Sequence, residues 1–264
     1  MDFQHIEIRI DDSVIWATLN RPEQLNALNT KLIEELTCFF RQLALRPDLR
    51  VVILQAAGRA FCAGADLKER GSSAQMGVIT GLAKQRSVRE IILAMRRCPQ
   101  PIISIVQGAA SGGGFALALA ADIRLGTPDA RMNAAFIRIG LSACDVGVSY
   151  FLPRMVGSSV AAEYMLTGRF MDAQRALALG LFSRVGPLEE LRSEAASMAA
   201  DMLLTSPLGL RLTKDALGLT IDANSLEAAM ALEDRNQIMC ANTQDFTEAK
   251  SAFLEKRTPR FQDR

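Results

Sequence analysis

Histidine is almost absent from this sequence: His5, close to the N-terminus, is the only one among 264 residues. A Ser–His–Asp or Cys–His enzyme needs an imidazole beside its nucleophile, and a histidine-ligated zinc site needs at least one histidine near its other ligands. The scarcity therefore argues against these classes of active site. No CxxC pair is present, and the cysteine count is an odd five. Because their neighbours are mostly apolar, we expect reduced core thiols at Cys38, Cys62, Cys98, Cys144 and Cys240.

An excess of charge and long apolar runs are also missing. The 30 basic and 29 acidic residues give a net charge of +1, and no basic run interleaves with aromatic residues. We therefore expect no nucleic-acid partner. The most apolar stretch, Ile102–Leu119, is interrupted by four glycines, so no membrane span is predicted. The first residues lack the pattern of a signal peptide, and we expect a cytoplasmic protein.

Short β-branched runs alternate with helical patterns in the first two thirds of the chain. Ile6–Ile10 alternates apolar and charged residues as a half-buried strand does, and Ser13–Leu19 is typical of its pairing partner. Asn29 is placed to cap a helix that runs to about Leu45. Further strands are predicted at Val51–Leu54, Ile102–Val106 and Asp122–Leu125. This order predicts an α/β fold with buried strands.

The last third is predicted to be helical, with helices at Leu188–Leu204, Pro207–Leu217, Leu226–Met239 and Phe246–Lys256. Pro207 after Ser206 is typical of a helix start, and Asn224 with Glu227 has the spacing of a capping box. We therefore predict a core over residues 1–190 and a helical C-terminal region over residues 191–264, which packs on the core or on a neighbouring subunit. The last four residues, Phe261–Arg264, are expected to form a loose tail.

Two loops rich in small residues follow predicted strands. In the first, Ala56–Lys68, the small residues at positions 63–65 let a ligand approach the main chain closely. The second, Gln107–Gly114, ends in three glycines and leads into an apolar run. A strand, a glycine turn and a helix start bring free N–H groups and the positive end of a helix dipole to one point, which suits an anion or a developing oxyanion. Neither the GxGxxG nor the Walker A pattern is present.

Several short motifs follow one another along the chain, in this order: Asn20-Arg21-Pro22, Leu25–Leu28, Phe61–Lys68, Gly112–Gly114, Leu166–Gly168, Ala178–Leu181 and Phe253–Arg257. Each motif alone is weak, but the ordered set covers nearly the whole chain and resembles the crotonase superfamily, the enoyl-CoA hydratase/isomerase family. The resemblance implies a crotonase-like spiral of ββα turns with a helical C-terminal region. It also implies an acyl-CoA thioester substrate and a homotrimer, or a hexamer made of two trimers.

The resemblance assigns roles to individual residues. The N–H groups of Ala65 and Gly113 match the family's oxyanion hole. The segment beside the CoA adenine is matched by Ala63, Asp66, Leu67 and Lys68. The C-terminal residues that reach the CoA nucleotide, often of a neighbouring subunit, are matched by Phe253 and Lys256. No metal and no separate cofactor are implied, because CoA enters as part of the substrate.

Two positions depart from the hydratase pattern. The resemblance implies that hydratases of the family use two glutamates as acid and base to add water, but the matching residues here are Ala116 and Phe136. Neither can carry a proton. Asp145 instead lies in a segment that resembles the isomerase branch, where a catalytic acid stands at the corresponding place. One carboxylate is sufficient to move a proton between two carbons, so we predict an enoyl-CoA isomerase-type proton shuttle that uses Asp145 and stabilises a thioester enolate.

Several alternatives stay open at this point. The chain is also compatible with an enoyl-CoA hydratase of unusual arrangement, or with thioesterase, decarboxylase or dehalogenase-like chemistry around the same oxyanion hole. Asp145 is then a nucleophile or, in the simplest case, only a helix cap. A non-catalytic acyl-CoA-binding protein is the remaining alternative. The acyl group and the pathway do not follow from these residues.

Overall fold

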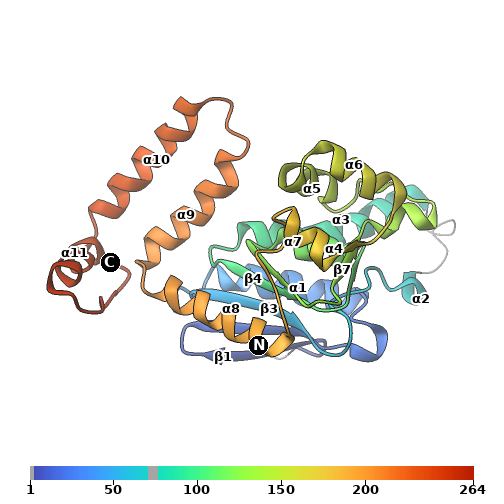
Figure 1. The fold of residues 1–264 in the computed structure, drawn as a ribbon, viewed down its shortest axis with the longest axis horizontal. Helices are drawn as coiled ribbons and strands as arrows, with labels where there is room; N and C mark the ends of the chain where they lie inside the picture. The colour runs from blue at the N-terminus through green and yellow to red at the C-terminus, as the bar shows by residue number, and fades with distance from the viewer. Residues whose placement is uncertain (1–2, 71–76) are drawn as a thin grey trace.

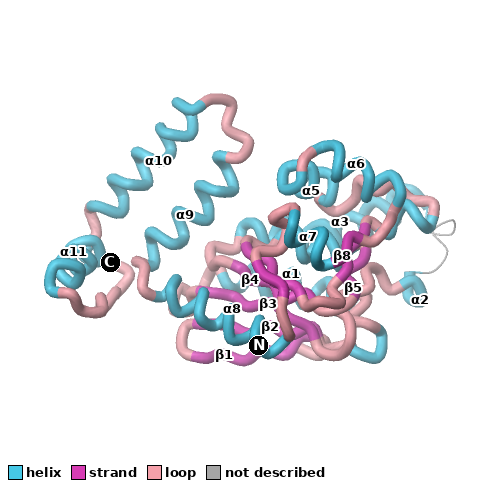
Figure 2. The backbone as a smooth tube through the Cα atoms, viewed as in Figure 1, coloured by secondary structure: helices cyan, strands magenta, loops and turns pink. Residues whose placement is uncertain are grey.

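The computed structural model describes residues 3–70 and 77–264, which form two sheets surrounded by helices (Figures 1 and 2). The larger sheet has six strands in the order β1-β2-β3-β4-β6-β9. These strands are β1 (Ile6–Asp11), β2 (Val14–Leu19), β3 (Val51–Ala56), β4 (Ile102–Val106), β6 (Ile123–Gly126) and β9 (Arg184–Val185). The predicted pairing of the first two strands is confirmed: β1 and β2 are antiparallel, with Ile6 opposite Leu19. All the later neighbours pair in parallel.

The smaller sheet has three strands, β5 (Ala109–Ser111), β7 (Arg131–Asn133) and β8 (Met171–Asp172). The chain alternates between the sheets: β4 of the larger sheet leads into β5 of the smaller one, and α4 (Gly113–Ala120) follows. The same change of sheet occurs between β6 and β7. The α/β class is therefore confirmed, and the triple glycine stands where a ββα turn passes from strand to helix.

Alternating side chains bury both faces of the larger sheet. Ile15, Ala17 and Leu19 of β2 face a core shared with α1 (Thr30–Leu43), α3 (Gly77–Arg97) and α4. Val14 and Trp16 face the opposite side, where α8 (Leu188–Leu203) packs its Leu191, Ala195 and Ala199. Trp16 is thus a core residue. Every residue of α4 is buried, which explains why its sequence is apolar on all sides.

Smaller elements complete the chain around the site. They are the 3-10 segments η1 (Pro22–Gln24) and η3 (Ala135–Ile139), and the helices α2 (Leu67–Arg70), α5 (Val148–Val156), α6 (Ser158–Thr167) and α7 (Ala173–Ala178). Asn29 caps α1 as predicted, its side chain accepting the N–H of Leu32 at 2.9 Å. The start of α1 lies beside the loop after β3, because the N–H of Leu28 donates to the carbonyl oxygen of Gly64 at 2.7 Å, and this contact places the site.

The C-terminal arm, residues 207–264, extends away from the two sheets (Figure 1). It contains α9 (Pro207–Thr220), α10 (Leu226–Ala241) and α11 (Gln244–Glu255), close to the predicted helices. The buried ammonium of Lys214 ties α9 to the core, 2.9 Å from Asp122 and 2.7 Å from the carbonyl oxygen of Gln100. No residue of α10 is buried in the single chain. Among the described residues, no helix is long and apolar enough to cross a membrane.

Three predictions about the arm and the cysteines were wrong in detail. Ser225 rather than Asn224 caps α10, since its hydroxyl accepts the N–H of Ala228. The tail is not loose: the buried carboxylate of Asp245 accepts the N–H groups of residues 262 and 263 at 2.7 and 2.8 Å. Only Cys62 and Cys98 are core thiols; Cys240 is half-buried and two others lie on the surface, Cys38 and Cys144. These errors share one cause, because each depends on which neighbours the folded chain supplies.

Candidate active site

The two loops predicted to carry the chemistry lie side by side. The N–H of Cys62 donates to the carbonyl oxygen of Ala109, and the N–H of Ser111 donates to the carbonyl oxygen of Cys62. A further bridge joins Leu28 to Ala65 in parallel, through the N–H of Leu28 and the carbonyl oxygen of Gly64. The loop after β3 is therefore fixed between the entry to α1 and β5.

Glycine is required where these loops touch. A Cβ at Gly114 would lie 2.1 Å from the carbonyl oxygen of Cys62. A Cβ at Gly64 would lie 2.6 Å from the carbonyl oxygen of Ser111, and Gly64 has a left-handed φ of +90°. Gly64 and Gly113 face each other directly, because a Cβ at Gly113 would lie 3.9 Å from the Cα of Gly64. The small residues of both loops thus allow a backbone-to-backbone contact, as their composition predicted.

Two N–H donors meet at this contact. Gly113 begins α4, so its N–H belongs to the group that a helix start leaves without an intrahelical acceptor. Within residues 3–70 and 77–264, the N–H groups of Ala65 and Gly113 donate to no protein acceptor. Both residues line the same cavity. Together with the positive end of the α4 dipole, these two donors can hold an oxygen that gains negative charge.

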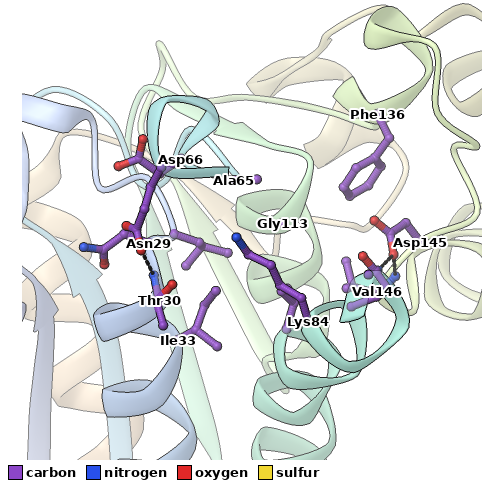
Figure 3. A pocket seen from close by; sticks show the side chains of 15 residues that line it. Asn29, Thr30, Ile33, Ala65, Asp66, Lys84, Gly113, Phe136, Asp145 and Val146 are labelled. Carbon is purple, nitrogen blue, oxygen red and sulfur yellow. Dashed lines mark hydrogen bonds between the residues drawn. The ribbon is translucent and has the colours of Figure 1, made fainter. Parts of the chain in front are cut away.

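The cavity has an apolar wall with a few polar groups (Figure 3). Its apolar lining comes from α1, α3, η3 and the loop before α5, and consists of Leu28, Ile33, Val88, Phe136 and Val146. Its polar lining consists of Asn29, Thr30, Asp66, Glu69, Lys84, Gln85 and Asp145. An enclosed apolar cavity with convergent polar groups is the usual form of a small-molecule site.

Asp145 is half-buried and stands on the wall of the cavity beside Phe136 (Figure 3). Its Oδ1 accepts hydrogen bonds from the side-chain amide of Gln85 and, at 2.8 Å, from the N–H of Val146. Val146 has a φ of +39°, in the left-handed region that a β-branched residue rarely occupies. Backbone strain of this kind is found preferentially at functional sites. Asp145 is thus held by two donors on a strained turn.

Asp66 has a different environment, although it lines the same cavity. Its carboxylate pairs with the guanidinium of Arg21 at 3.2 Å. Burial raises the pKa of Asp66, but the Arg21 guanidinium and the N–H groups of residues 68 and 69 outweigh it and lower the pKa below its ordinary value. Asp66 therefore stays ionised and ties the first loop to the segment before α1, where the buried side chain of Asn26 donates to the carbonyl oxygens of Ala57 and Ala60.

Cys62, whose carbonyl oxygen lies against Gly114, is not suited to act as a nucleophile. Cys62 is fully buried beneath the triple glycine. Burial raises the pKa of its thiol to about 12, so the thiolate needed for nucleophilic attack is not formed near neutral pH. Nucleophilic cysteine chemistry at this position is therefore disfavoured, in agreement with the scarcity of histidine.

The structure separates the predicted site residues into three groups. Ala65, Asp66, Gly113 and Asp145 line one cavity. Ala63, Leu67 and Lys68 lie in the same loop or at the start of α2, with Leu67 and Lys68 exposed, which leaves them accessible to a ligand. Phe253 and Lys256 are exposed on α11 and just after it, at the end of the molecule opposite α2 (Figure 1). A single chain does not bring this last pair to the cavity.

The sequence analysis missed two polar groups of the cavity, Lys84 and Gln85. Both belong to α3, and they line the cavity together with Gly81 and Val88. The spacing of these four residues, i, i+3, i+4 and i+7, puts them on one face of a helix. The structure describes this helix from Gly77 onward, and residues 71–76 lie outside the described part of the chain.

The two hydratase positions give contrasting results. Ala116 is fully buried inside α4 and does not line the cavity. Phe136 does line it, and its ring packs over Gly112, where an added Cβ would lie 3.3 Å from Cε1. The described carboxylates on the cavity wall are therefore Asp66, Glu69 and Asp145. Of these, Glu69 is exposed and accepts the N–H of Thr30 at 3.2 Å.

Known proteins resemble the chain over nearly its whole length. The sequence profile described as enoyl-CoA hydratase/isomerase matches residues 9–264. A Mycobacterium bovis protein named "Probable enoyl-CoA hydratase" is 42% identical over 251 residues, covering 93% of this chain and 88% of that protein. The 1,2-epoxyphenylacetyl-CoA isomerase of Escherichia coli is 32% identical over 253 residues, covering 96% of each chain. Relatives with both kinds of activity in their names thus match the whole core and the arm.

Solved structures resemble the chain equally well. The enoyl-CoA hydratase of Bacillus anthracis superposes with a TM-score of 0.93 at 33% identity, covering 99% of this chain and 100% of that chain. A second enoyl-CoA hydratase, from Mycobacterium smegmatis, superposes with a TM-score of 0.90 at 32% identity, covering 97% of this chain and 98% of that chain. The similarity includes the helical C-terminal arm as well as the two sheets.

Proposed function

The chain belongs to the enoyl-CoA hydratase/isomerase family, with the crotonase fold that its motifs predicted, and on that premise we propose that it isomerises an enoyl-CoA thioester with Asp145 as the proton carrier. The proposal is supported by one observation: the N–H groups of Ala65 and Gly113 line the same cavity as the carboxylate of Asp145. That carboxylate accepts hydrogen bonds from Gln85 and from the N–H of Val146. An acyl-CoA substrate follows from the family. The choice of isomerisation rests on the residues.

The proposed reaction moves one proton. The thioester oxygen lies between the N–H groups of Ala65 and Gly113, and Asp145 faces the acyl chain. For a 3-enoyl-CoA, Asp145 takes a proton from C2, and the electrons of the C–H bond form a dienolate whose charge rests largely on the thioester oxygen. The protonated carboxyl group then gives the proton to C4, and the double bond moves to C2–C3. No water is added and no co-reactant is consumed.

Magnitudes support the division of labour between the two parts of the site. Removing one donor of a comparable oxyanion hole costs about 2.7–4 kcal/mol of transition-state stabilisation. A positioned acid–base group contributes about 10²–10⁴-fold to the rate. Both contributions are needed, because the backbone donors can stabilise the dienolate only after a base has removed the proton that leads to it.

Hydration is the second candidate, because Glu69 is a further carboxylate that lines the cavity. Glu69 lines the cavity from α2, and a pair of Asp145 and Glu69 is an arrangement that can both activate and protonate. The Mycobacterium bovis relative is named a hydratase. Isomerisation is preferred because Glu69 is exposed and engaged by the N–H of Thr30, whereas Asp145 has the strained, doubly hydrogen-bonded setting.

The test compares the wild type with Asp145→Asn on hex-3-enoyl-CoA. Isomerisation conjugates the double bond with the thioester, which is followed by ultraviolet absorbance. We expect kcat to fall by about 10²–10⁴-fold in the variant, while calorimetry gives unchanged affinity for the non-reactive hexanoyl-CoA. Glu69→Gln is the matched control and should retain the wild-type rate. A wild-type rate in the Asp145 variant would remove this residue from the reaction, and loss of isomerisation only in the Glu69 variant would assign the proton transfer to Glu69.

The arm supports a second proposal about assembly, that copies of the chain form a trimer through residues 207–264. Its exposed apolar side chains include Leu226, Met230, Ile238, Met239, Phe253 and Leu254. Such a surface is unusual for a monomer and typical of an interface. Within a trimer, Phe253 and Lys256 can reach the nucleotide of a neighbour's substrate. Light scattering on the purified protein tests this: three chains support the proposal, and a monomer at micromolar concentration contradicts it.

A further inference from the structure

Asp145 depends on a residue far from it in the sequence. The side-chain amide of Gln85 donates to Oδ1 of Asp145, and 60 residues separate the two. The N–H of Val146 donates to the same oxygen at 2.8 Å. The two donors approach from different elements, α3 on one side and the turn before α5 on the other. Together they fix the plane of the carboxylate as well as its position.

The helix that carries Gln85 is well anchored. The C-terminal half of α3 buries Ile91, Ile92, Ala94 and Met95 in the main core. Ile92 also packs against the turn after Asp145, since a Cβ at Gly147 would lie 3.6 Å from its Cγ2. Gln85 stands two turns before Ile92 on the same side of the helix. Its amide is therefore held by the same packing that holds the Asp145 turn.

The turn itself is shaped to present the carboxylate. Val146 adopts a φ of +39° and Gly147 a φ of +88°. The carbonyl oxygen of Asp145 accepts the N–H of Val148 at 2.9 Å, which closes the turn at the start of α5. A conformation this unfavourable for valine persists only where the surrounding contacts determine it. Gln85 supplies one of these contacts, and it does so at the carboxylate.

Gln85 acts on charge as well as on geometry. A neutral amide that donates to a carboxylate stabilises the ionised form without adding a charge to the cavity. The ionised form is the one that can accept a proton from the acyl chain. A leucine at this position would keep the volume and lose the donor. From the hydrogen bond, the anchored helix and the strained turn, we infer that Gln85 is a positioning residue, which orients the carboxylate of Asp145 and favours its ionised form. This inference rests on the proposed function.

Three other described charged side chains line the cavity with Asp145. Lys84 of α3, Asp66 of the first loop and Glu69 of α2 share its cavity. Asp66 is neutralised by Arg21. Lys84 points into the cavity (Figure 3).

Apart from Lys84, three arginines on these elements whose side chains the structure describes are engaged elsewhere or line another cavity. Arg138 of η3 donates to the carbonyl oxygen of Thr167, and Arg154 of α5 pairs with Asp222. Arg89 of α3 lines the adjoining cavity. Changing Gln85 alone leaves each of these described charges in place and removes one hydrogen-bond donor to Asp145.

The test is a pH–rate profile of Gln85→Leu, measured with hex-3-enoyl-CoA on the full-length protein. We expect kcat to fall by about tenfold and KM to stay within about twofold, because the residue contacts Asp145 rather than the CoA ester. The acid limb of kcat/KM reports the free enzyme's base. It should move to higher pH by about one unit, the size of shift that one hydrogen bond to a carboxylate produces.

Gln85→Glu provides a second variant if the leucine protein folds poorly. It puts a second carboxylate beside the first, so its acid limb should move further toward high pH than that of Gln85→Leu, because two like charges share one proton. Arg86→Gln is the matched control: Arg86 is the next residue on α3, is exposed, does not line the cavity, and should leave the profile unchanged.

The outcomes distinguish a wrong role for Gln85 from a wrong role for Asp145. An acid limb that coincides with that of the wild type in both Gln85 variants overturns the inference, whatever happens to kcat, since a merely structural role changes the rate without changing the titration. If Asp145→Asn turns over at the wild-type rate, the proposed function itself is wrong. If Asp145→Asn is inactive while Gln85→Leu keeps both rate and profile, only the role of Gln85 fails.

Discussion

Two helical glycines should respond in opposite directions to the same substitution. Gly114 lies in α4 and Gly81 in α3. In an open helical position, glycine to alanine stabilises a protein by about 0.5–1 kcal/mol, because alanine loses less conformational entropy on folding. A Cβ at Gly81 meets nothing within 4 Å, so Gly81→Ala should raise the free energy of unfolding by about that amount.

At Gly114 the same Cβ meets the backbone. It would lie 2.1 Å from the carbonyl oxygen and 2.8 Å from the carbonyl carbon of Cys62, and these atoms cannot rotate away as a side chain can. Ordinary contact distances require a displacement of roughly 1 Å or more. Overpacking of this kind costs about 1–3 kcal/mol. After the gain in helix propensity is subtracted, Gly114→Ala should lower the free energy of unfolding by about 1–2 kcal/mol.

The displacement should also reach the chemistry, because the contact that is pushed apart brings Ala65 to Gly113. Loss of one oxyanion donor corresponds to about 10²–10³-fold in kcat. Urea unfolding followed by circular dichroism gives the stability difference from the midpoints, provided that the slopes agree. Steady-state kinetics gives the rate. If Gly114→Ala is as stable and as active as Gly81→Ala, the close backbone contact described for the two loops does not exist.

Three further perturbations follow from the structure. Arg21→Met should destabilise the protein near pH 7 by about 2 kcal/mol. Because Arg21 lowers the pKa of Asp66, the part of this difference that comes from the ion pair is fully present above the unfolded value of about 4 and should be lost as pH falls through the lower folded value. The hydrogen bond from Arg21 to the carbonyl oxygen of Ala27 does not titrate, so urea titrations at several pH values should show a smaller difference at low pH. In the native protein a thiol reagent should label the exposed Cys38 within minutes and spare Cys62 until the protein unfolds, and mass spectrometry of digested samples will identify the labelled peptide. Deleting residues 261–264 should lower the melting temperature by several degrees, since it leaves a buried carboxylate without its N–H partners; an unchanged melting temperature would mean that the tail is not docked.

Local signals predicted most of the elements correctly. The cap at Asn29, the proline start after Ser206 and the glycine turn before α4 each depend on chemistry within a few residues, and each occurs as expected. The small residues of the two loops indicated that the main chain is accessible there, whereas Ala65 and Gly113 were named as donors only by the resemblance to the family. The order of the motifs along the chain predicted the family.

Contacts between distant segments were not predictable in the same way. No pattern around Gln85 indicates that its amide will meet a carboxylate 60 residues later. The docking of the tail depends on Asp245, whose burial is a property of the folded arm. Asp145 was found only because the segment around it resembles the isomerase branch, and its strained neighbour Val146 gave no signal in the sequence. Tertiary packing decided each of these cases.

The central claim is that Asp145 alone moves a proton on an acyl chain whose thioester is held by Ala65 and Gly113. The most direct test is to incubate hex-3-enoyl-CoA with the wild type in D₂O and to record the product's mass and label position. The account predicts hex-2-enoyl-CoA with deuterium at the acyl carbons, no gain of water, and no exchange in Asp145→Asn. A product heavier by one molecule of water, or equal exchange in the variant, would contradict it.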